Sequence, residues 1–392
     1  MMSPRLKARL GNLGLLAVSV VATLAVLEHG VFRYLLPPDD LLENVTINGV
    51  VRYMPNTRAT FRHPDGRTSL VTVNADGWNS TKPGYPAAKP AGRTRIAVIG
   101  DSYVHGAFIN VEEAFPEVME SGLRAKGLDV EVYRFGMDGA PLSQYLHVLR
   151  REVLAYRPDV VVVPLIHNDF DESYRQLKTR YASSFMKLTR TGDGGIVEVP
   201  PGEFGYGLAD ALRGYRTFRY LYYKTNLYLH AKGIVSRVFW GGNEDWKPEF
   251  VSSAVDIRKI GDHASNRLFA HYVMAEMKQL SLEHGFKLAF VMDGVREAVY
   301  AKRKPGEYEV GMLNRIAADI TRQLDLPFVD LQDTFARDYA RHGQRFEFAY
   351  DWHWDAHANR LVAGAVSDLL VQDPRIGLSA PRRAADAGLL RH

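Results

Sequence analysis

The chain has 392 residues, of which 46% are hydrophobic and 24% are charged, a composition typical of a folded globular protein and not of a disordered chain. The formal net charge is +4 and the basic residues are scattered, which argues against a nucleic-acid-binding protein. The lack of cysteine excludes disulfides, a thiol nucleophile and cysteine-ligated metal sites.

The first predicted element is an apolar helix near the N-terminus. Three basic residues lie within residues 1–9, and residues 10–27 then contain no charge and are long enough to span a bilayer. This order predicts a cytoplasmic basic flank and a single-pass protein of the cell membrane, with the rest of the chain on the periplasmic or extracellular side. A cleaved signal peptide ending at Ala25 is the alternative, and we prefer the uncleaved anchor because the apolar run is long for a signal sequence.

Residues 28–94 are expected to form a small β-rich extension that ends in a linker. Apolar and polar residues alternate at 58–63 and 69–74, on either side of a Pro-Asp-Gly-Arg turn, which predicts a hairpin. Proline and glycine are frequent in residues 74–92, which predicts a linker.

A regular alternation of strands and helices extends over residues 95–371. Strands are expected at 95–100, 129–135, 158–166, 286–293 and 327–331, and helices at 112–127, 141–157, 265–285, 308–326 and 357–372. Strands separated by helix-length segments predict an α/β sandwich around a parallel sheet.

Residues 170–262 interrupt this alternation and are expected to form a helical insertion. Aromatic residues cluster at 214–230, and residues 239–250 are rich in turn-forming residues. The mixture of aromatic and basic residues suits either helix packing, which we favour, or contact with a sugar or a membrane surface. Residues 372–392 are expected to form a tail.

Candidate catalytic residues follow the predicted strands. Ligand sites of open α/β sheets lie at the carboxyl ends of the strands. Ser102 ends a Gly-Asp-Ser turn after the first strand, where a serine can be an exposed nucleophile or an ordinary helix cap. Gly139 lies in a glycine-rich turn after the second strand, and Asn168 follows the third; each can donate an N–H to an oxyanion or serve a turn or cap.

A histidine and an aspartate precede the last predicted helix. An imidazole at His353 could lie beside Ser102, with Asp351 holding its tautomer. Asp355 and His357 repeat the same spacing, so a two-histidine, two-aspartate metal site is an alternative. We disfavour it because the chain has no helical His-x-x-x-His pair with a nearby glutamate of the metalloprotease kind.

These motifs together resemble the SGNH (GDSL-type) hydrolase superfamily, and more specifically a membrane-anchored bacterial branch related to polysaccharide O-acetyltransferases of the same fold. The four matching blocks are Gly-Asp-Ser at 100–102, Arg-Phe-Gly-Met-Asp-Gly at 134–139, Asn-Asp at 168–169 and Asp-Trp-His-Trp at 351–354. The resemblance implies a three-layer α/β/α sandwich with a flavodoxin-like parallel sheet. It further implies Ser102 as nucleophile, His353 as base, Asp351 as orienting acid, and an oxyanion hole formed by Ser102, Gly139 and Asn168, with no cofactor and no metal.

The chain departs from the family pattern in three of the four blocks. Arg134 stands where the second block usually has asparagine, and Ile166 where the third usually has glycine. The last block has Asp355, His357 and Asn359 where the family typically has asparagine, a small residue and histidine, which leaves open which Asp–His pair acts. We prefer Asp351 and His353, because they align best with the Arg-Leu-Val-Ala that follows.

The resemblance implies a serine esterase that cleaves an acyl ester, expected to be acetyl, on an extracytoplasmic substrate such as an envelope or exported glycan. An O-acyltransferase using the same Ser–His–Asp site, a lipase acting at the membrane surface, and an inactive membrane-tethered glycan-binding protein are the alternatives. The expected partners are an acylated small molecule or glycan and the inner membrane, contacted through the N-terminal helix. No nucleic-acid partner is expected, and the sequence indicates neither protein partners nor oligomeric state.

Overall fold

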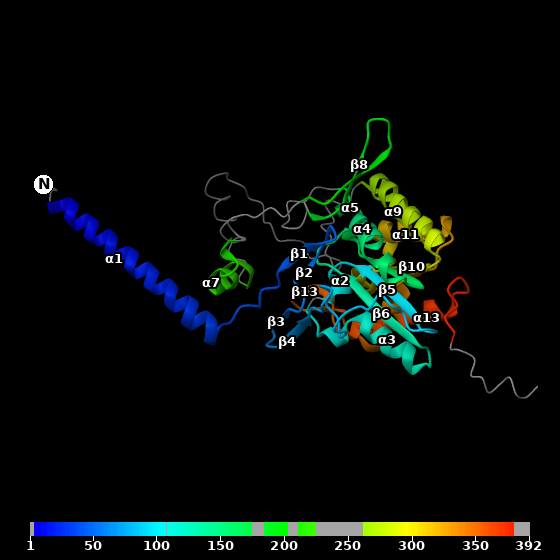
Figure 1. The fold of residues 1–392 in the computed structure, drawn as a ribbon, viewed down its shortest axis with the longest axis horizontal. Helices are drawn as coiled ribbons and strands as arrows, with labels where there is room; N and C mark the ends of the chain where they lie inside the picture. The colour runs from blue at the N-terminus through cyan, green and yellow to red at the C-terminus, as the bar shows by residue number, and fades with distance from the viewer. Residues whose placement is uncertain (1–3, 107, 175–183, 203–210, 225–261, 380–392) are drawn as a thin grey trace, which may run out of the picture. The chain divides into compact units, whose positions relative to one another are not determined.

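A computed structural model of the chain describes residues 4–106, 108–174, 184–202, 211–224 and 262–379 (Figure 1). The chain divides into two compact units. The first contains residues 1–41, 59–67 and 205–247, and the second contains residues 42–58, 68–204 and 248–392. The turn-rich stretch 239–250 and most of the expected tail lie outside the described residues.

The second unit is built on a parallel sheet of five strands in the order β11-β10-β7-β5-β6. The strands are β5 (Thr94–Gly100), β6 (Val130–Gly136), β7 (Val160–Leu165), β10 (Lys287–Met292) and β11 (Phe328–Asp330). Numbered along the chain, this order is the 2-1-3-4-5 of flavodoxin-like sheets. Every residue of β7 is buried, as expected for a central parallel strand that is covered on both faces.

Helices cover both faces of this sheet, which confirms the predicted three-layer sandwich. Two of them, α3 (Phe115–Ala125) and α13 (Ala356–Gln372), lie on one face, and α4 (Leu142–Arg151), α9 (His263–His284) and α11 (Gly311–Gln323) lie on the other (Figure 1). The shorter helices are α2 (Ser102–His105), η2 (Val111–Glu113), η3 (Val153–Tyr156), α5 (Asn168–Glu172), α10 (Arg296–Ala301), η7 (Pro305–Glu307) and α12 (Gln332–His342). The sequence had not predicted α10, α12 or the strand pair β12 (Glu347–Phe348) and β13 (Asp351–Trp354).

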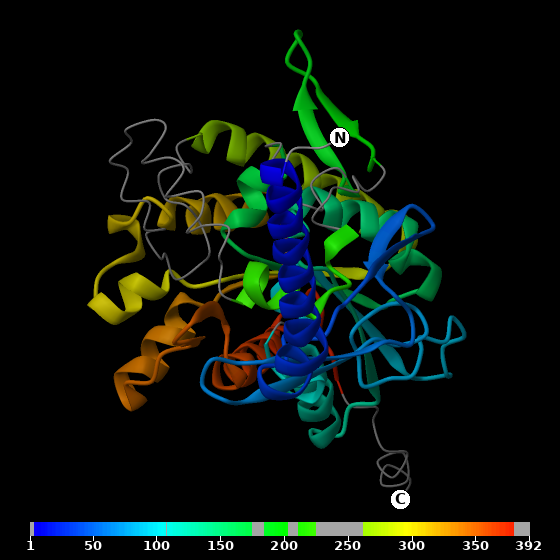
Figure 2. The same ribbon diagram turned by 90° about the vertical axis from the view of Figure 1, so that its left-hand side faces the viewer.

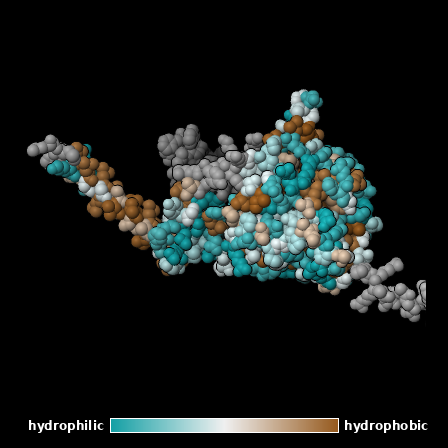
Figure 3. All heavy atoms as spheres, in the orientation of Figure 1, coloured by the Kyte–Doolittle hydropathy of each residue, from teal (hydrophilic) through white to brown (hydrophobic). Residues whose placement is uncertain are grey.

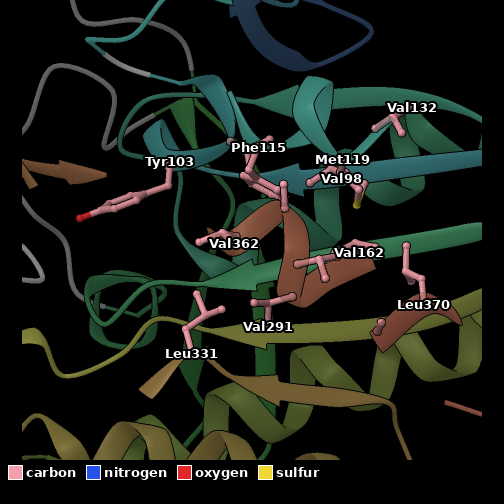
Figure 4. Close-up of a cluster of buried hydrophobic side chains, with 14 of the residues drawn as sticks. Val98, Tyr103, Phe115, Met119, Val132, Val162, Val291, Leu331, Val362 and Leu370 are labelled. Carbon is pink, nitrogen blue, oxygen red and sulfur yellow. The ribbon is translucent and has the colours of Figure 1, made fainter. Parts of the chain in front are cut away.

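The main core lies between the sheet and helices α3 and α13. Valines from four strands meet Phe115 and Met119 of α3 and Val362 and Leu370 of α13 (Figure 4). Full burial of such a side chain stabilises the fold by about 1.5–3 kcal/mol. The ring of Tyr103 joins this cluster, while its hydroxyl points away from the other labelled side chains (Figure 4).

The stretch expected to be a linker, residues 74–92, is packed into the second unit instead. Trp78 is fully buried, and Tyr85 stacks on Tyr133 with ring centroids 4.3 Å apart. The Oδ1 of Asn74 accepts the backbone N–H groups of Asp76 and Trp78, so a polar side chain replaces regular secondary structure here. Proline and glycine predicted the irregular backbone correctly, but the aromatic residues between them anchor it.

Four strands form the β-rich extension: β1 (Asn44–Ile47), β2 (Val50–Tyr53), β3 (Arg58–Arg62) and β4 (Thr68–Thr72). The described part of the expected helical insertion contains both strands and short helical turns. It contains an antiparallel hairpin of β8 (Lys187–Arg190) and β9 (Ile196–Val199), which extends beyond the helices of the second unit in two views (Figures 1 and 2). The helical turns α7 (Arg216–Arg219) and η5 (Tyr220–Lys224) belong to the first unit.

The first unit contains the apolar N-terminal helix α1 (Pro4–Val26), which continues as the π-helix η1 (Leu27–Leu35). Every side chain from residue 5 to 26 is exposed, and the helix surface is largely hydrophobic (Figure 3). With a mean hydropathy of 2.2 over its best window, this helix is long and apolar enough to cross a membrane, and a signal sequence would have the same properties.

Candidate active site

Ser102 lies where β5 ends and α2 begins. The carboxylate of Asp101 accepts the N–H of Tyr103 at 2.9 Å and so caps this short helix. Two glycines allow the tight junction: a Cβ on Gly100 would lie 2.4 Å from a side-chain carbon of Val104, and a Cβ on Gly136 would lie 2.2 Å from the backbone nitrogen of His105. Small residues at the ends of β5 and β6 therefore place the serine at the carboxyl edge of the sheet.

A chain of short contacts joins Ser102 to His353 and Asp351. The Nε2 of His353 lies 2.7 Å from the Oγ of Ser102, and its Nδ1 lies 2.5 Å from the Oδ1 of Asp351. The same carboxylate oxygen accepts the backbone N–H of His353 at 2.8 Å. Residues 251 positions apart thus form the arrangement in which a carboxylate orients an imidazole and the imidazole can accept a serine proton.

Acidic groups around His353 favour its protonated form. Burial lowers the pKa of this imidazole, but the hydrogen bond and charge of Asp351, with the charges of Asp101 and Asp138, outweigh burial and raise the pKa above 6.5. Burial also raises the pKa of Asp101 to about 7, although the N–H of Tyr103 and the charge of His353 oppose that effect. Asp101 therefore lies next to the serine as a helix cap, and its ionised form favours the protonated form of His353.

Gly139 lies in the turn after β6, with a φ of +69° that favours glycine. The residue before it, Asp138, is held by two buried side chains that the sequence had not suggested, Tyr53 and His105. The N–H of Asp138 donates to the hydroxyl of Tyr53 at 3.1 Å, and the Asp138 carboxylate lies 2.6 Å from Nδ1 of His105. The rings of Tyr53 and His105 pack at 4.5 Å, so strand β2 of the extension supports the Gly139 turn. The only sequence feature shared by His105 and Asp138 is that each directly precedes a glycine, Gly106 or Gly139.

Asn168 begins α5, at the carboxyl end of β7, the other neighbour of β5 in the sheet. Its amide hydrogen-bonds to Glu172, while its buried Oδ1 has no partner within the described residues. The next residue, Asp169, fixes the turn by accepting the N–H of Ile166 at 2.7 Å and the hydroxyl of Tyr145 at 2.8 Å. Gly139 and Asn168 therefore flank the strand that positions the serine.

Arg296 joins the segments that carry the serine and the histidine. This guanidinium is fully buried, and it donates to the carbonyl of Trp352 at 2.7 Å and to the hydroxyl of Tyr103 at 3.0 Å. The Tyr103 hydroxyl itself donates to the same Trp352 carbonyl at 3.0 Å. The arginine thus contacts the neighbours of both Ser102 and His353.

Two buried carboxylates balance the charge of Arg296. Asp293 lies 3.3 Å from the guanidinium and Glu347 lies 3.5 Å from it. Asp293 also accepts the indole N–H of Trp354 at 3.1 Å, on the far side of His353 along β13. No sequence motif pointed to Arg296, because arginine is seldom buried and its partners are distant in sequence.

The second Asp–His pair has other partners. Asp355 caps α13 by accepting the N–H of Ala358 at 2.8 Å, and His357 lies 2.7 Å from the carboxylate of Asp338. Across the described ranges, no group of three or more histidine, aspartate or glutamate side chains is placed to hold a metal ion. The geometry therefore favours Asp351 and His353 as the pair that serves Ser102.

Three of the residues that depart from the family pattern, Arg134, Ile166 and Asn359, are buried. Arg134 is buried and lies 3.6 Å from Glu117, and its Nε donates to the carbonyl of Asn79. Ile166 is fully buried in the main core, and Asn359 accepts the N–H of Phe115 at 2.9 Å. Each of the three has a packing or hydrogen-bonding role.

Residues 96–193 match the family model described as GDSL-like Lipase/Acylhydrolase. Three solved structures are similar in fold: TesA (12% identity, TM-score 0.37, covering 70% of this chain and 98% of that one), a lipase/acylhydrolase from Enterococcus faecalis (14%, 0.38, 74% and 100%), and a catalytic mutant of Axe2, an acetylxylan esterase from Geobacillus stearothermophilus (12%, 0.39, 74% and 97%). No curated protein matches the chain.

Proposed function

We propose that this protein is a hydrolase acting on ester bonds and that Ser102 is its nucleophile, because residues 96–193 match the GDSL-like Lipase/Acylhydrolase model and include this serine. His353 is the general base and Asp351 the carboxylate that orients it. The observation that supports these roles is the pair of contacts from Ser102 Oγ to His353 Nε2, at 2.7 Å, and from His353 Nδ1 to Asp351, at 2.5 Å.

The reaction proceeds in two acyl-transfer steps. His353 Nε2 takes the Ser102 proton as Oγ attacks the ester carbonyl, and the imidazolium then gives that proton to the departing alcohol. A water molecule, deprotonated by His353, attacks the acyl-serine, and the proton returns to Oγ as the carboxylic acid leaves. Atoms balance without a metal or a redox partner: one ester and one water give one alcohol and one acid.

The tetrahedral oxyanion needs donors at the carboxyl edge of the sheet. We assign them to the N–H groups of Ser102 and Gly139 and to the side-chain amide of Asn168. An amide nitrogen has two hydrogens, so Asn168 can hydrogen-bond to Glu172 and still donate to the oxyanion. Each such donor contributes on the order of 10²–10³ in rate.

We propose that the substrate is an acyl ester, in particular an acetyl ester, on a glycan. Two aromatic side chains beside the base support a sugar-binding surface: Phe108, whose ring lies 5.6 Å from that of His353, and Trp352, which is 37% exposed. Phe108 has a φ of +65°, a left-handed conformation that is rare for a bulky residue and costs about 1–3 kcal/mol. Such strain is concentrated at functional sites.

We further propose that residues 10–27 anchor the protein in the inner membrane and that the hydrolase domain, residues 95–371, acts on the periplasmic or extracellular side. The exposed apolar surface of α1 and the basic residues before it support this topology. Alkaline carbonate extraction tests it: an anchored protein stays with the membrane pellet and a cleaved one is released. A protease added outside spheroplasts should digest the domain, and resistance would contradict the proposed side.

The proposed reaction is tested with purified full chain, acetylated polysaccharide and the same polysaccharide after chemical deacetylation. We expect free acetate from the acetylated polymer, and none from the Ser102→Ala variant. Transfer of acetyl to the bare polymer without acetate release would establish an acyltransferase instead. Activity restricted to long-chain esters would establish a lipase, and binding of the glycan without turnover would contradict an enzyme.

A further inference from the structure

The first unit contains an apolar hollow that is separate from the residues assigned to catalysis. It has a volume of about 720 Å³, within the range of roughly 300–1,000 Å³ typical of small-molecule sites. One wall is the last part of the apolar helix α1, where Val21, Leu24 and Ala25 line it. The hollow therefore lies against the C-terminal half of the segment that is long enough to cross a membrane.

The opposite wall is an aromatic segment that precedes and includes α7 and η5. Tyr215, Phe218 and Leu221 line the hollow from this side. The rings of Phe218 and Tyr222 stack at 4.9 Å. Both walls are thus made of side chains that favour an apolar guest.

A single carboxylate fixes the two walls together. Glu28, two residues beyond the end of α1, accepts the backbone N–H groups of Arg216 and Thr217 at 2.9 and 2.8 Å and the Thr217 hydroxyl at 2.9 Å. Phe32 of η1 stacks on Tyr220 with ring centroids 4.6 Å apart. These contacts make the hollow a built feature of the first unit, because they hold the aromatic segment against the helix.

One carboxylate, Glu28, lines the hollow and lies 3.9 Å from Arg216, but the segment that forms the opposite wall is itself basic. Three arginines, Arg213, Arg216 and Arg219, lie within residues 211–222, and this stretch contains no acidic residue. Arginine and aromatic residues at the end of a membrane-spanning helix are typical of the membrane–water interface, where basic side chains attract anionic lipid headgroups.

We propose that this hollow binds one acyl chain of an anionic membrane phospholipid, with the phosphate beside the three arginines. The occupant is a bilayer lipid because one wall is the apolar helix itself, whose exposed surface is already suited to lipid. The proposal rests on the proposed membrane anchor and is independent of the roles assigned to Ser102 and His353.

The test is native mass spectrometry of the full chain reconstituted in nanodiscs that contain equal amounts of phosphatidylglycerol and phosphatidylcholine. We expect the released protein to retain one phosphatidylglycerol. Two variants fill the hollow from opposite walls, Ala25→Phe and Leu221→Trp, and both should lose the bound lipid. The matched control is Val18→Phe, on the same helix and exposed but not among the lining residues, and it should retain the lipid.

The headgroup is tested with Arg216→Gln, which keeps the backbone N–H that Glu28 accepts and removes one charge. We expect this variant to lose the preference for phosphatidylglycerol. The proposal would be overturned if the parent stays in the membrane under carbonate but carries no bound lipid. It would also be overturned if the two filled variants retain as much lipid as the Val18→Phe control, or if the protein is released as a dimer in place of a lipid-bound monomer. Release of the parent by carbonate would instead contradict the anchor itself.

Discussion

Two replacements of Arg296 can show whether this residue affects the catalytic rate by positioning Ser102 and His353 or only by stabilising the fold. The guanidinium donates to the Trp352 carbonyl next to His353 and to the Tyr103 hydroxyl next to Ser102. We compare Arg296→Lys, which keeps a positive charge, with Arg296→Met, which removes it. Both variants remove the planar fork that contacts two oxygens at once.

The two variants should differ in stability. Arg296→Met leaves Asp293 buried without its countercharge and leaves Glu347 with Arg345 alone, and breaking a buried pair costs about 3–5 kcal/mol of unfolding free energy. Arg296→Lys keeps the charge and should cost less. One ammonium cannot replace both donors, so β13 should shift, and a displacement of about 1 Å at a catalytic group can lower the rate by about 10²-fold.

The assay is kcat and KM for a soluble acetyl ester, together with urea unfolding. The matched control is Arg345→Met, because Arg345 also pairs with Glu347, at 2.5 Å, but its side chain is 60% exposed and its charge is therefore largely solvated. We expect the control to keep its kcat and to lose at most about 1 kcal/mol of stability. An Arg296→Lys protein that is folded and has the parent kcat would refute the positioning role.

Three further predictions concern the reacting groups. Asp351→Asn should lower kcat by on the order of 10³–10⁴, because the imidazole loses the partner that sets its tautomer, and an unchanged kcat would contradict the role of Asp351. The kcat/KM of the parent should rise with pH through an apparent pKa above 6.5, because only neutral His353 accepts the serine proton and its pKa is raised; a midpoint below 6.5 would be inconsistent with the environment of His353. Asn168→Ala should lower kcat by about 10²–10³ with little change in KM, and a change in KM alone would point to substrate binding instead.

The strands of the central sheet could be predicted from sequence because their apolar runs are continuous. The runs at 95–100 and 158–166 correspond to β5 and β7 within two residues at each end. Burial on both faces produces such runs, and helix-length spacing between them indicates parallel pairing. The Gly-Asp-Ser, Asn-Asp and Asp-Trp-His-Trp motifs then placed the candidate site at the edge of this sheet.

Other parts of the fold and of the site depend on contacts between residues far apart in the chain, which a local sequence pattern does not indicate. β12 has two residues and β13 has four, too short for a strand period to stand out around Asp351 and His353. Segment 74–92 has the composition of a loop. It is packed into the second unit because the side chain of Trp78 is buried there. Arg296 lies 56 residues from the carbonyl that it contacts, so its position could not be predicted from sequence.

Labelling by a fluorophosphonate probe tests the central assignment most directly, because the probe reacts with an activated serine and needs no knowledge of the natural ester. We predict that the folded parent is labelled at Ser102, that Ser102→Ala is not labelled, and that labelling of the parent slows as the pH falls and His353 becomes protonated. An unlabelled parent, or equal labelling of Ser102→Ala, would contradict the assignment of Ser102 as the nucleophile.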